Sequence, residues 1–566
     1  MKFNEYKYER PNINKLKEEI DLISLKLSNA KDFNEALELV KESENIIDKF
    51  NCMYDLAMIR NSIDMSDEFY DKEMEFFSKE APKFTSSTTN LSKVIVNSKF
   101  KNEFINYYSL QWFKLKEISL KTFNDSIIPD LTKENKLVNE YDKLIAQAKI
   151  EYDGKINNLS QMAKYSSSSD RNVRKEAAIK VAEYMSSIEA KVDEIYDELV
   201  KVRTSMAKKL GYKNFVELGY LNMNRTDYDS KMVKVYRDQV YKSVVPVAKK
   251  CIELQKENIG IDDLKFYDIP FFFKDGNPVH GKTKDELLKA AKDMYKKISK
   301  YTDEYFNYMC DNELLDLETK PNKSRGGYCE FVPYYNFPFI FSNFNGTTAD
   351  VDVLTHEAGH GFQVYTAAKY LKSKEIVWPT YEACEIHSMS MEFIAHPYME
   401  NFFGNDADKY RYKHLSDSIT FIPYGVAVDE FQHYVYENYD ASIADRKNMW
   451  RKLEKKYLPW KDYDSIDYYI NGAFWHKQGH IFSSPFYYID YTLAQVCAFY
   501  FYLLDLSNHD ECLNKYYNLC KMGGSYSFIE LLEKNNIINP FIEGSLDNIM
   551  APLYKQLLKL KDKAIK

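Results

Sequence analysis

Two histidines four residues apart flank a glutamate in the segment Thr355-His356-Glu357-Ala358-Gly359-His360. On a helix, residues four apart project from the same face with about 5–6 Å between their Cβ atoms, so both imidazoles can reach one metal ion. Imidazole nitrogen is a preferred ligand of zinc, and a catalytic zinc site has three protein ligands and one open position. The pattern predicts that His356 and His360 bind zinc, and that Glu357 is the general base that takes a proton from zinc-activated water.

Histidine is concentrated around this motif, since eight of the ten histidines lie between residues 356 and 480. Asp352 stands one turn before His356, where its carboxylate could orient the imidazole by a hydrogen bond. An acid at that place is equally typical of a helix start, where it interacts with the helix dipole. Gly359 lies between the two histidines, and we expect it to permit close helix packing.

The third metal ligand has to come from another part of the chain. Residues 380–400 have helical spacing and contain several candidates. Glu385, Glu392 and His396 stand at positions i, i+7 and i+11, which share one face over three turns. The residues alone leave the third ligand open between Glu385, Glu392 and His387. We interpret whichever histidines of this region do not bind metal as structural.

The distribution of glycine and proline predicts the elements that hold these residues. Residues 1–210 contain one of the 18 glycines, Gly154, and three of the 16 prolines. A stretch with so few breakers and many Lys, Glu and Leu predicts consecutive long helices. Between residues 323 and 348, aromatic and β-branched residues bounded by Gly326-Gly327 and Asn345-Gly346 predict two short strands joined by a proline-containing turn. Helical patterns then continue to the end, so we predict a mainly α protein with one small β-sheet beside the zinc-binding helices.

The length of 566 residues exceeds what one hydrophobic core usually organises. We predict an N-terminal helical lobe over residues 1–205 and a catalytic domain over residues 206–566. The net charge is −8, and acidic and basic residues are mixed along the chain, which argues against nucleic acid as a partner. Eight cysteines without a CxxC pair indicate neither a disulfide framework nor a cysteine metal site.

The apolar segments of the sequence predict no membrane partner. The first ten residues carry five charges and have no apolar stretch typical of a secretory signal. The longest apolar run extends over nine residues, from Val496 to Leu504, whereas about 20 are needed to span a bilayer. A cytoplasmic location is therefore the expectation.

The chain resembles the oligoendopeptidase F and thimet oligopeptidase family of zinc peptidases. The resemblance is carried by the HExGH segment, the opening YERPNI, the stretch AKKLGYKNFVELGYLNMNRTD, the segment GGYC and the late GGS. Gln363 follows the motif where the thimet branch usually has a third histidine, which favours the oligoendopeptidase F branch. The resemblance implies one Zn²⁺ per chain, with Glu385 as the ligand 25 residues after His360, and Glu392 seven residues further as a supporting residue.

The resemblance also predicts an opposite wall of the site. Related enzymes carry a histidine and then two tyrosines three residues apart, whose side chains reach the substrate carbonyl. Tyr488 and Tyr491 have this spacing and His480 is the corresponding histidine, with His476 as an alternative. The segment has one residue fewer between histidine and tyrosines than the thimet branch, so the choice between Tyr487 and Tyr488 is open.

The family resemblance implies two helical lobes that enclose a deep channel. Such a channel admits short unfolded peptides and excludes folded proteins, so the expected function is that of a zinc-dependent endopeptidase acting on short peptides. One alternative is a metallocarboxypeptidase of similar helical fold. Another is a non-catalytic peptide-binding protein, against which the intact Glu357 argues. The oligomeric state, the cleavage preference and the physiological substrate do not follow from the sequence.

Overall fold

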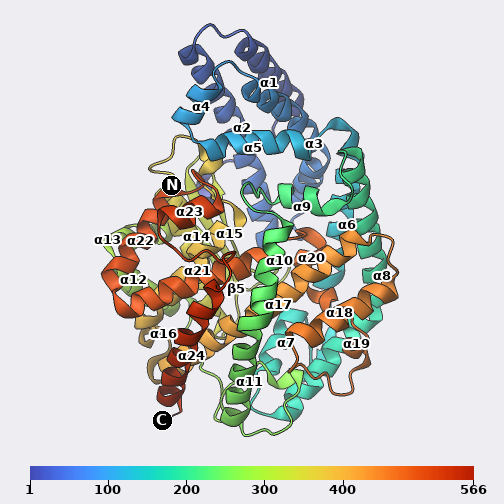
Figure 1. Ribbon diagram of the computed structural model, residues 1–566, viewed down its shortest axis with the longest axis vertical. Helices are drawn as coiled ribbons and strands as arrows, with labels where there is room; N and C mark the ends of the chain where they lie inside the picture. Colours follow the sequence, from blue (N-terminus) through green and yellow to red (C-terminus); the bar gives the residue numbers. More distant parts are fainter. Residues whose placement is uncertain (566) are drawn as a thin grey trace.

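A computed structural model describes residues 1–565, and the chain is built mainly of α-helices (Figure 1). The first helices pack against one another around a core of their own, which includes Ile20, Phe84 and Trp112. Asp32 and Asp67 start two of these helices by accepting hydrogen bonds from backbone N–H groups of the first turn. The N-terminal helices are α1 (Ile13–Ser28), α2 (Phe33–Ile63), α3 (Glu68–Val96), α4 (Lys101–Tyr107) and α5 (Leu110–Thr122).

The next part of the chain contains the longest helix of the structure and a short hairpin. The hairpin pairs β1 (Ile150–Tyr152) with β2 (Lys155–Asn157), in a stretch for which we predicted helices alone. Its turn is Asp153-Gly154, and both residues have positive φ, which is a strong two-residue hairpin signal. The helices of this part are α6 (Ile128–Ala146), α7 (Leu159–Ser166), α8 (Arg171–Lys209), α9 (Phe215–Asn222), α10 (Ser230–Gln239), α11 (Val245–Ile259), α12 (Lys284–Ile298) and α13 (Lys300–Asp311).

A three-stranded sheet precedes the histidine motif. The two predicted strands are confirmed as β4 (Tyr328–Val332) and β5 (Phe337–Phe344), which pair antiparallel. A third strand, β3 (Leu315–Glu318), pairs parallel with β5 on its other side, so the strand order is β3-β5-β4. β4 is therefore an edge strand, and its outer backbone groups are not taken up by the sheet.

The remainder of the chain is helical, and three of its helices carry the candidate site. α15 packs against both α14 and α21. The helices after the sheet are α14 (Ala349–Ala367), α15 (Tyr381–Ile394), α16 (Glu400–Phe403), α17 (Ala407–Glu437), α18 (Ile443–Tyr457), α19 (Asp467–Ile470), α20 (Gly479–Ser483), α21 (Tyr488–Ser507), α22 (His509–Met522), α23 (Phe528–Lys534) and α24 (Ser545–Ala564).

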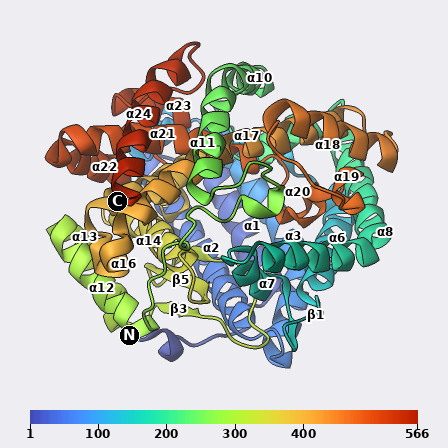
Figure 2. The ribbon, with the colours of Figure 1, turned by 90° about the horizontal axis from the view of Figure 1, so that it is seen from below.

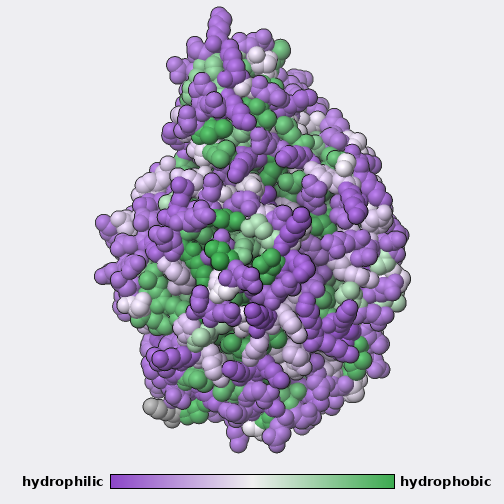
Figure 3. Space-filling view, viewed as in Figure 1, coloured by the Kyte–Doolittle hydropathy of each residue, from purple (hydrophilic) through white to green (hydrophobic). Residues whose placement is uncertain are grey.

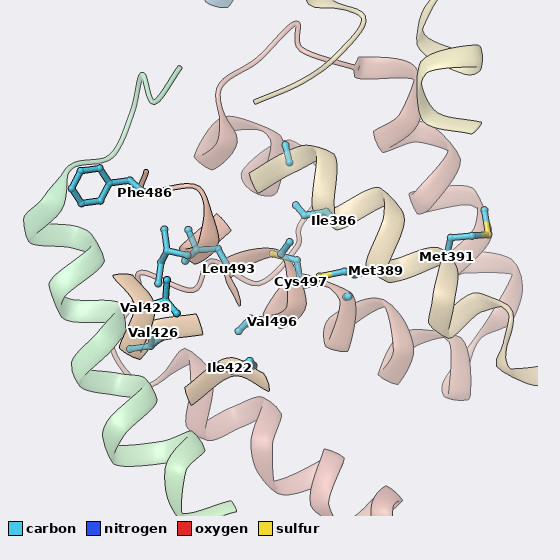
Figure 4. Close-up of a cluster of buried hydrophobic side chains, with 14 of the residues drawn as sticks. Ile386, Met389, Met391, Ile422, Val426, Val428, Phe486, Leu493, Val496 and Cys497 are labelled. Atoms are coloured by element: carbon cyan, nitrogen blue, oxygen red, sulfur yellow. The ribbon is translucent and has the colours of Figure 1, made fainter. Parts of the chain in front are cut away.

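Buried apolar side chains fix these helices relative to one another (Figure 4). Ile386 of α15 and Leu493 of α21 lie in one fully buried cluster with Val426 of α17. Gly359 allows α14 to approach α15, because a Cβ atom there would lie 2.8 Å from the carbonyl oxygen of His387. The predicted role of Gly359 in close helix packing is confirmed.

Two groups of helices lie on opposite sides of the molecule below the N-terminal helices. α8 and α18 lie on one side, and α12, α13 and α22 lie on the other, in both views (Figures 1 and 2). A large core runs from Phe3 to Ala564 and includes residues of α8 as well as of α14, α15 and α21. The predicted fold class, mainly α with a small sheet beside the site, is confirmed, while the division at residue 205 stays a prediction.

The surface shown in Figure 3 is mostly hydrophilic, with hydrophobic residues in separate patches. Within residues 1–565, no helix combines the length and the apolar character needed to cross a membrane.

Candidate metal centre and active-site cleft

The turn between β5 and α14 brings the HExxH motif to the sheet. The Asp350 carboxylate accepts hydrogen bonds from the backbone N–H groups of Asn345 (2.9 Å) and Gly346 (2.8 Å), and so closes this turn. On the neighbouring strand end, Gly327 lies so close that a Cβ atom there would be 3.3 Å from Oε1 of Glu357. The start of β4 and the first turns of α14 therefore meet at the motif.

His356, His360 and Glu385 converge on one point between α14 and α15. Their nearest ligand atoms all lie within 4.8 Å of one another. Nε2 of each histidine lies 3.3 Å from Oε2 of Glu385. A tetrahedral zinc ion with bonds of about 2.0–2.2 Å spaces its ligand atoms by about 3.4 Å, so this arrangement fits the ion. Burial opposes ionisation of Glu385, but the two imidazoles outweigh it and hold the pKa of this carboxyl well below its usual range.

A chain of polar side chains orients His356 from behind. Oε1 of Glu392 lies 2.6 Å from Nδ1 of His356, and its Oε2 lies 2.7 Å from Nε2 of His414. His414 continues the chain to His396, with 2.9 Å between the two ring nitrogens. Metal-bound histidines are commonly held by a carboxylate on their second nitrogen, and Glu392 occupies that place here. His414 was missed in the sequence because it lies on α17, with no spacing that relates it to the motif.

Of the two roles expected for Asp352, the hydrogen bond to His356 is not formed, whereas its position in the first turn of α14 fits the helix-start acid. Its carboxylate accepts a hydrogen bond from the hydroxyl of Tyr410 on α17, at 2.6 Å. The Nδ1 atom of His356 is already occupied by Glu392. One turn of helix separates Asp352 from His356, but the two side chains point to different neighbours, so the expected contact between them is absent among the described residues.

Three tyrosines at the start of α21 make different contacts around the predicted metal centre. The Tyr487 hydroxyl donates a hydrogen bond to Oε1 of Glu385 at 2.6 Å. Tyr491 lies on the same wall, and its hydroxyl is 3.3 Å from Nε2 of His480. Tyr488 also lies beside His480, but on the side away from Glu385. The structure thus brings Tyr487 and Tyr491 to the predicted ligands, and it places Tyr488 and His480 next to them.

A buried ion pair fixes the beginning of α21. The guanidinium of Arg225 donates to the Phe486 carbonyl oxygen at 2.6 Å and to Oδ1 of Asp490 at 2.7 Å. Phe486 has a φ of 69°, a left-handed conformation that is strained for a bulky residue. The Gln432 side chain accepts the backbone N–H of Phe486 at 2.9 Å. These long-range contacts set which tyrosine turns toward Glu385.

The predicted ligands and Glu357 line a cavity of about 470 Å³, which we call the metal cavity. Its lining comes from distant parts of the chain: Gln111 and Leu115 of α5, the first residues of β4, residues of α14 and α15, and Tyr487 with Tyr491. Glu357 is only 6% exposed, and no other side chain among residues 1–565 hydrogen-bonds to its carboxylate. Burial raises the pKa of Glu357. A second cavity, of about 430 Å³, lies beside the first and is lined by His480 and Tyr488, and Tyr491 borders both.

Two other histidines considered in the sequence are structural. His476 is fully buried and lies 3.0 Å from the Asp193 carboxylate, away from both cavities. His387 is also fully buried, and its Nδ1 lies 2.7 Å from the carbonyl oxygen of Ala383. Burial lowers the pKa of His387 to about 3, so its ring is neutral at ordinary pH.

Similarity to known proteins identifies the family of the chain. The family profile "Peptidase M3 N-terminal domain" matches residues 3–123, and "Peptidase family M3" matches residues 164–550. A solved structure of PZ peptidase A with an inhibitor is 46% identical, covers 99% of this chain and 100% of its own, and superposes with a TM-score of 0.97. A protein from Bacillus anthracis assigned as an oligoendopeptidase F is also 46% identical, with coverage of 100% and 99% and a TM-score of 0.92.

A more distant structure shares the fold alone. Oligoendopeptidase F from Enterococcus faecium is 16% identical and has a TM-score of 0.63, with 97% of this chain and 98% of that chain covered. Among curated proteins, no match to the chain was found. The fold and the close structural relatives define a metalloendopeptidase. The chain belongs to peptidase family M3, in its oligoendopeptidase F branch, which confirms the resemblance noted in the sequence.

Proposed function

We propose that this chain hydrolyses internal bonds of short, unfolded peptides, with one zinc ion held by His356, His360 and Glu385 and with Glu357 as the general base. The observation that carries the proposal is the state of Glu357. Its carboxylate is buried, lines the cavity beside the three converging ligand atoms, and has no protein partner within residues 1–565. A carboxylate without a structural partner at this place is free to exchange a proton with a bound molecule.

The ion and the chain have separate tasks in this proposal. When bound, zinc lowers the pKa of water from about 15.7 toward about 7 and polarises the scissile carbonyl. Glu357 removes a proton from the attacking water and delivers it to the leaving amine. Its buried position, which raises its pKa, makes its carboxylate a stronger base for the first step. Glu392 holds the ring of His356 in the orientation that ligation requires.

The tyrosine wall supplies hydrogen-bond donors to the reacting carbonyl. The Tyr491 hydroxyl borders the metal cavity and has His480 beside it, so it is positioned to donate to the oxyanion. Tyr487 donates to Glu385 and thereby fixes this ligand. Tyr488 and His480 extend the wall into the neighbouring cavity, where they contact the flanking part of the peptide.

The peptide binds as an extended strand along β4. β4 is the edge of its sheet, and its residues Cys329 and Glu330 line the metal cavity. An extended peptide added to this edge would use the free backbone groups of β4 for hydrogen bonds. Because β4 begins next to Glu357, this placement brings a backbone carbonyl of the peptide to the general base.

The concrete test is Glu357→Gln. The substitution keeps the size of the side chain and removes the base, so the variant should retain zinc and lose cleavage of a quenched peptide. Zinc content by mass spectrometry and cleavage rate are measured on the same preparation. Retained cleavage would refute the assignment of Glu357.

A metallocarboxypeptidase is the rival activity, and the products separate it from the proposal. Peptides blocked at both ends offer no free carboxyl terminus. Internal fragments from such peptides, identified by mass spectrometry, support an endopeptidase. Release of single C-terminal residues from unblocked peptides alone, with blocked peptides left intact, would favour the rival. If the Glu357→Gln variant and the unchanged chain both bind blocked peptides without cutting them, the chain is a peptide-binding protein.

A further inference from the structure

Two carboxyl groups without a cationic partner meet beside the metal cavity. Asp55 projects from α2, which packs against β4, and Glu330 belongs to β4. Asp55 is 7% exposed, and within residues 1–565 neither a hydrogen bond nor an ion pair reaches its carboxylate. Glu330 accepts a hydrogen bond from the backbone N–H of Phe331 at 3.0 Å. Buried acids are normally paired with a base or a metal. Within residues 1–565, no basic side chain is paired with either of these two carboxylates.

One acid of the pair, Glu330, and both nearby tyrosines line cavities. Glu330 lines the metal cavity, and Asp55 interacts electrostatically with Glu330. Tyr54, the neighbour of Asp55, lines a further cavity of about 640 Å³ between the N-terminal helices and the 483–485 segment. Tyr381 borders both this cavity and the metal cavity. Glu330, Tyr54 and Tyr381 therefore line these two cavities, and Asp55, which lines neither, follows Tyr54 on α2.

The side chains around Glu330 are suited to binding a positively charged group. Two carboxylates attract a cation, and the exposed faces of Tyr54 and Tyr381, each 38% exposed, can interact with it through their rings. Burial raises the pKa of Glu330 to about 7 and that of Asp55 well above its usual range, as expected for a pair that has no bound cation.

We propose that Asp55 and Glu330, flanked by Tyr54 and Tyr381, form a subsite for a cationic group of the bound peptide. The inference rests on the proposed peptidase function and adds a preference for a lysine or arginine side chain, or for a free α-amino group. Glu330 stands three residues after Gly327, where a Cβ atom would lie 3.3 Å from Glu357, so its backbone is roughly 10 Å along β4 from this point and its side chain is on the other face of the strand. A cation about three residues from the scissile bond fits this distance.

The experiment uses peptides blocked at both ends that differ at one position. Lysine and uncharged norleucine are compared at each place from three residues before to three residues after the scissile bond. A second series compares a free with an acetylated N-terminus on the norleucine peptide. For the natural chain we expect lysine at one of these positions, or the free N-terminus, to raise kcat/KM at least about tenfold over the uncharged peptide. This factor corresponds to one hydrogen bond to a charged group.

The double variant Asp55→Asn and Glu330→Gln should reduce the ratio of kcat/KM between the cationic and the uncharged peptide to about one. Both substitutions keep side-chain size and remove unpaired buried charge, and thermal unfolding verifies the fold. The matched control is Glu38→Gln, an acid of the same helix whose side chain is 72% exposed, and it should keep the ratio of the natural chain.

The outcomes separate this inference from the proposed function. Cleavage of the norleucine peptide establishes the peptidase activity by itself. A natural chain that cuts this peptide without any preference for a cation, or a double variant that keeps the preference, overturns the subsite. If no peptide is cut, calorimetric binding of the lysine and norleucine peptides to the Glu357→Gln variant decides: equal affinities, or no binding at all, also overturn it.

Discussion

At the scale of single residues, the tyrosines of the site differ in what their hydroxyls contact. Tyr487 and Tyr491 stand four residues apart at the start of α21 and therefore share a face. That face points to Glu385 and the metal cavity, whereas Tyr488 is turned toward the neighbouring cavity. One hydroxyl thus contacts a predicted ligand, one side chain lines the cavity of the predicted metal site, and one lines the cavity beside it.

Substitution by phenylalanine should distinguish these tyrosines. Tyr491→Phe removes a donor to the oxyanion and should lower kcat by about 10²–10³ while zinc stays bound. Tyr487→Phe frees one oxygen of Glu385 and should weaken zinc binding by about 10–100-fold. Steady-state kinetics and zinc titration check both effects.

The control for this series is Tyr500→Phe. Tyr500 lies on the same helix, but its hydroxyl accepts a hydrogen bond from Lys515, so this substitution should change neither kcat nor zinc binding. A Tyr488→Phe variant with a larger loss of kcat than Tyr491→Phe would contradict the assignment of the walls.

The sequence predicts the residues of the site unequally. His356, Glu357 and His360 follow from local helical spacing, because four residues always bring two side chains to one face. Glu385 required the family offset, since spacing on α15 fits Glu392 equally well. The choice between Tyr487 and Tyr488 could not be predicted, because it depends on the left-handed Phe486 and on its long-range bond to Arg225.

At the scale of elements, α14 and α15 meet at a point that has no room for a side chain. Gly359→Ala would place a Cβ atom 2.8 Å from the His387 carbonyl oxygen and the Ser388 Cα atom. Both are backbone atoms of α15, so the helices have to move apart. We expect a loss of about 1–3 kcal/mol in the free energy of unfolding, seen as a lower thermal midpoint, together with weaker zinc binding.

Gly479→Ala is the matched control for this prediction. A Cβ atom at Gly479 would meet only Tyr141, at 4.0 Å. Its backbone does not need a positive φ. Helix propensity favours alanine over glycine, so an equal loss of stability in both variants would show that the effect has a general cause and does not come from the contact between α14 and α15.

The contact between α2 and β4 should make stability depend on pH. Burial raises the pKa of Glu330 from 4.5 to about 7 and raises that of Asp55 as well. Between about pH 4.5 and 7 the folded chain therefore holds protons that the unfolded chain releases, so the free energy of unfolding falls as pH rises. The double variant Asp55→Asn and Glu330→Gln should lose part of this fall, on the order of 1–2 kcal/mol.

Thermal midpoints of the natural chain and of the double variant, measured across this pH range, show the pH dependence of stability. Parallel curves for the natural chain and the double variant would contradict it, because the remaining titrating groups are common to both.

Strand prediction succeeded where residue type and glycine boundaries gave a clear local signal. β4 and β5 were predicted because glycines bound a run of aromatic and β-branched residues. β3 has only four residues and becomes a strand by pairing with β5, which no local pattern indicates. The hairpin β1–β2 was missed although Asp153-Gly154 carries its turn signal, because the surrounding residues favour helices.

At the scale of the whole molecule, the metal cavity is closed by parts that are distant in the sequence. Gln111 and Leu115 of α5 line it together with residues of α14 and α15. The ion pair between Lys116 and Glu375 and the hydrogen bond from Ser373 to Glu44 join the N-terminal helices to the segment before α15. The predicted deep channel would lie along this junction.

This closure predicts selection by substrate size. Peptides of about ten residues should be cut, whereas a folded protein that contains the same sequence in a structured region should stay intact. Cleavage of both by the same preparation is followed by mass spectrometry. Equal rates for the folded protein and the peptide would contradict a narrow access path.

The exposed edge of β4 has one more consequence, which concerns self-association. An edge strand with free backbone groups can pair with the strand of another molecule and start aggregation. Here α2 packs against β4, so we expect the N-terminal helices to hinder the approach of a second molecule to this edge. We therefore expect the helices that are proposed to restrict substrates also to limit self-association, so a chain that lacks them should aggregate more readily.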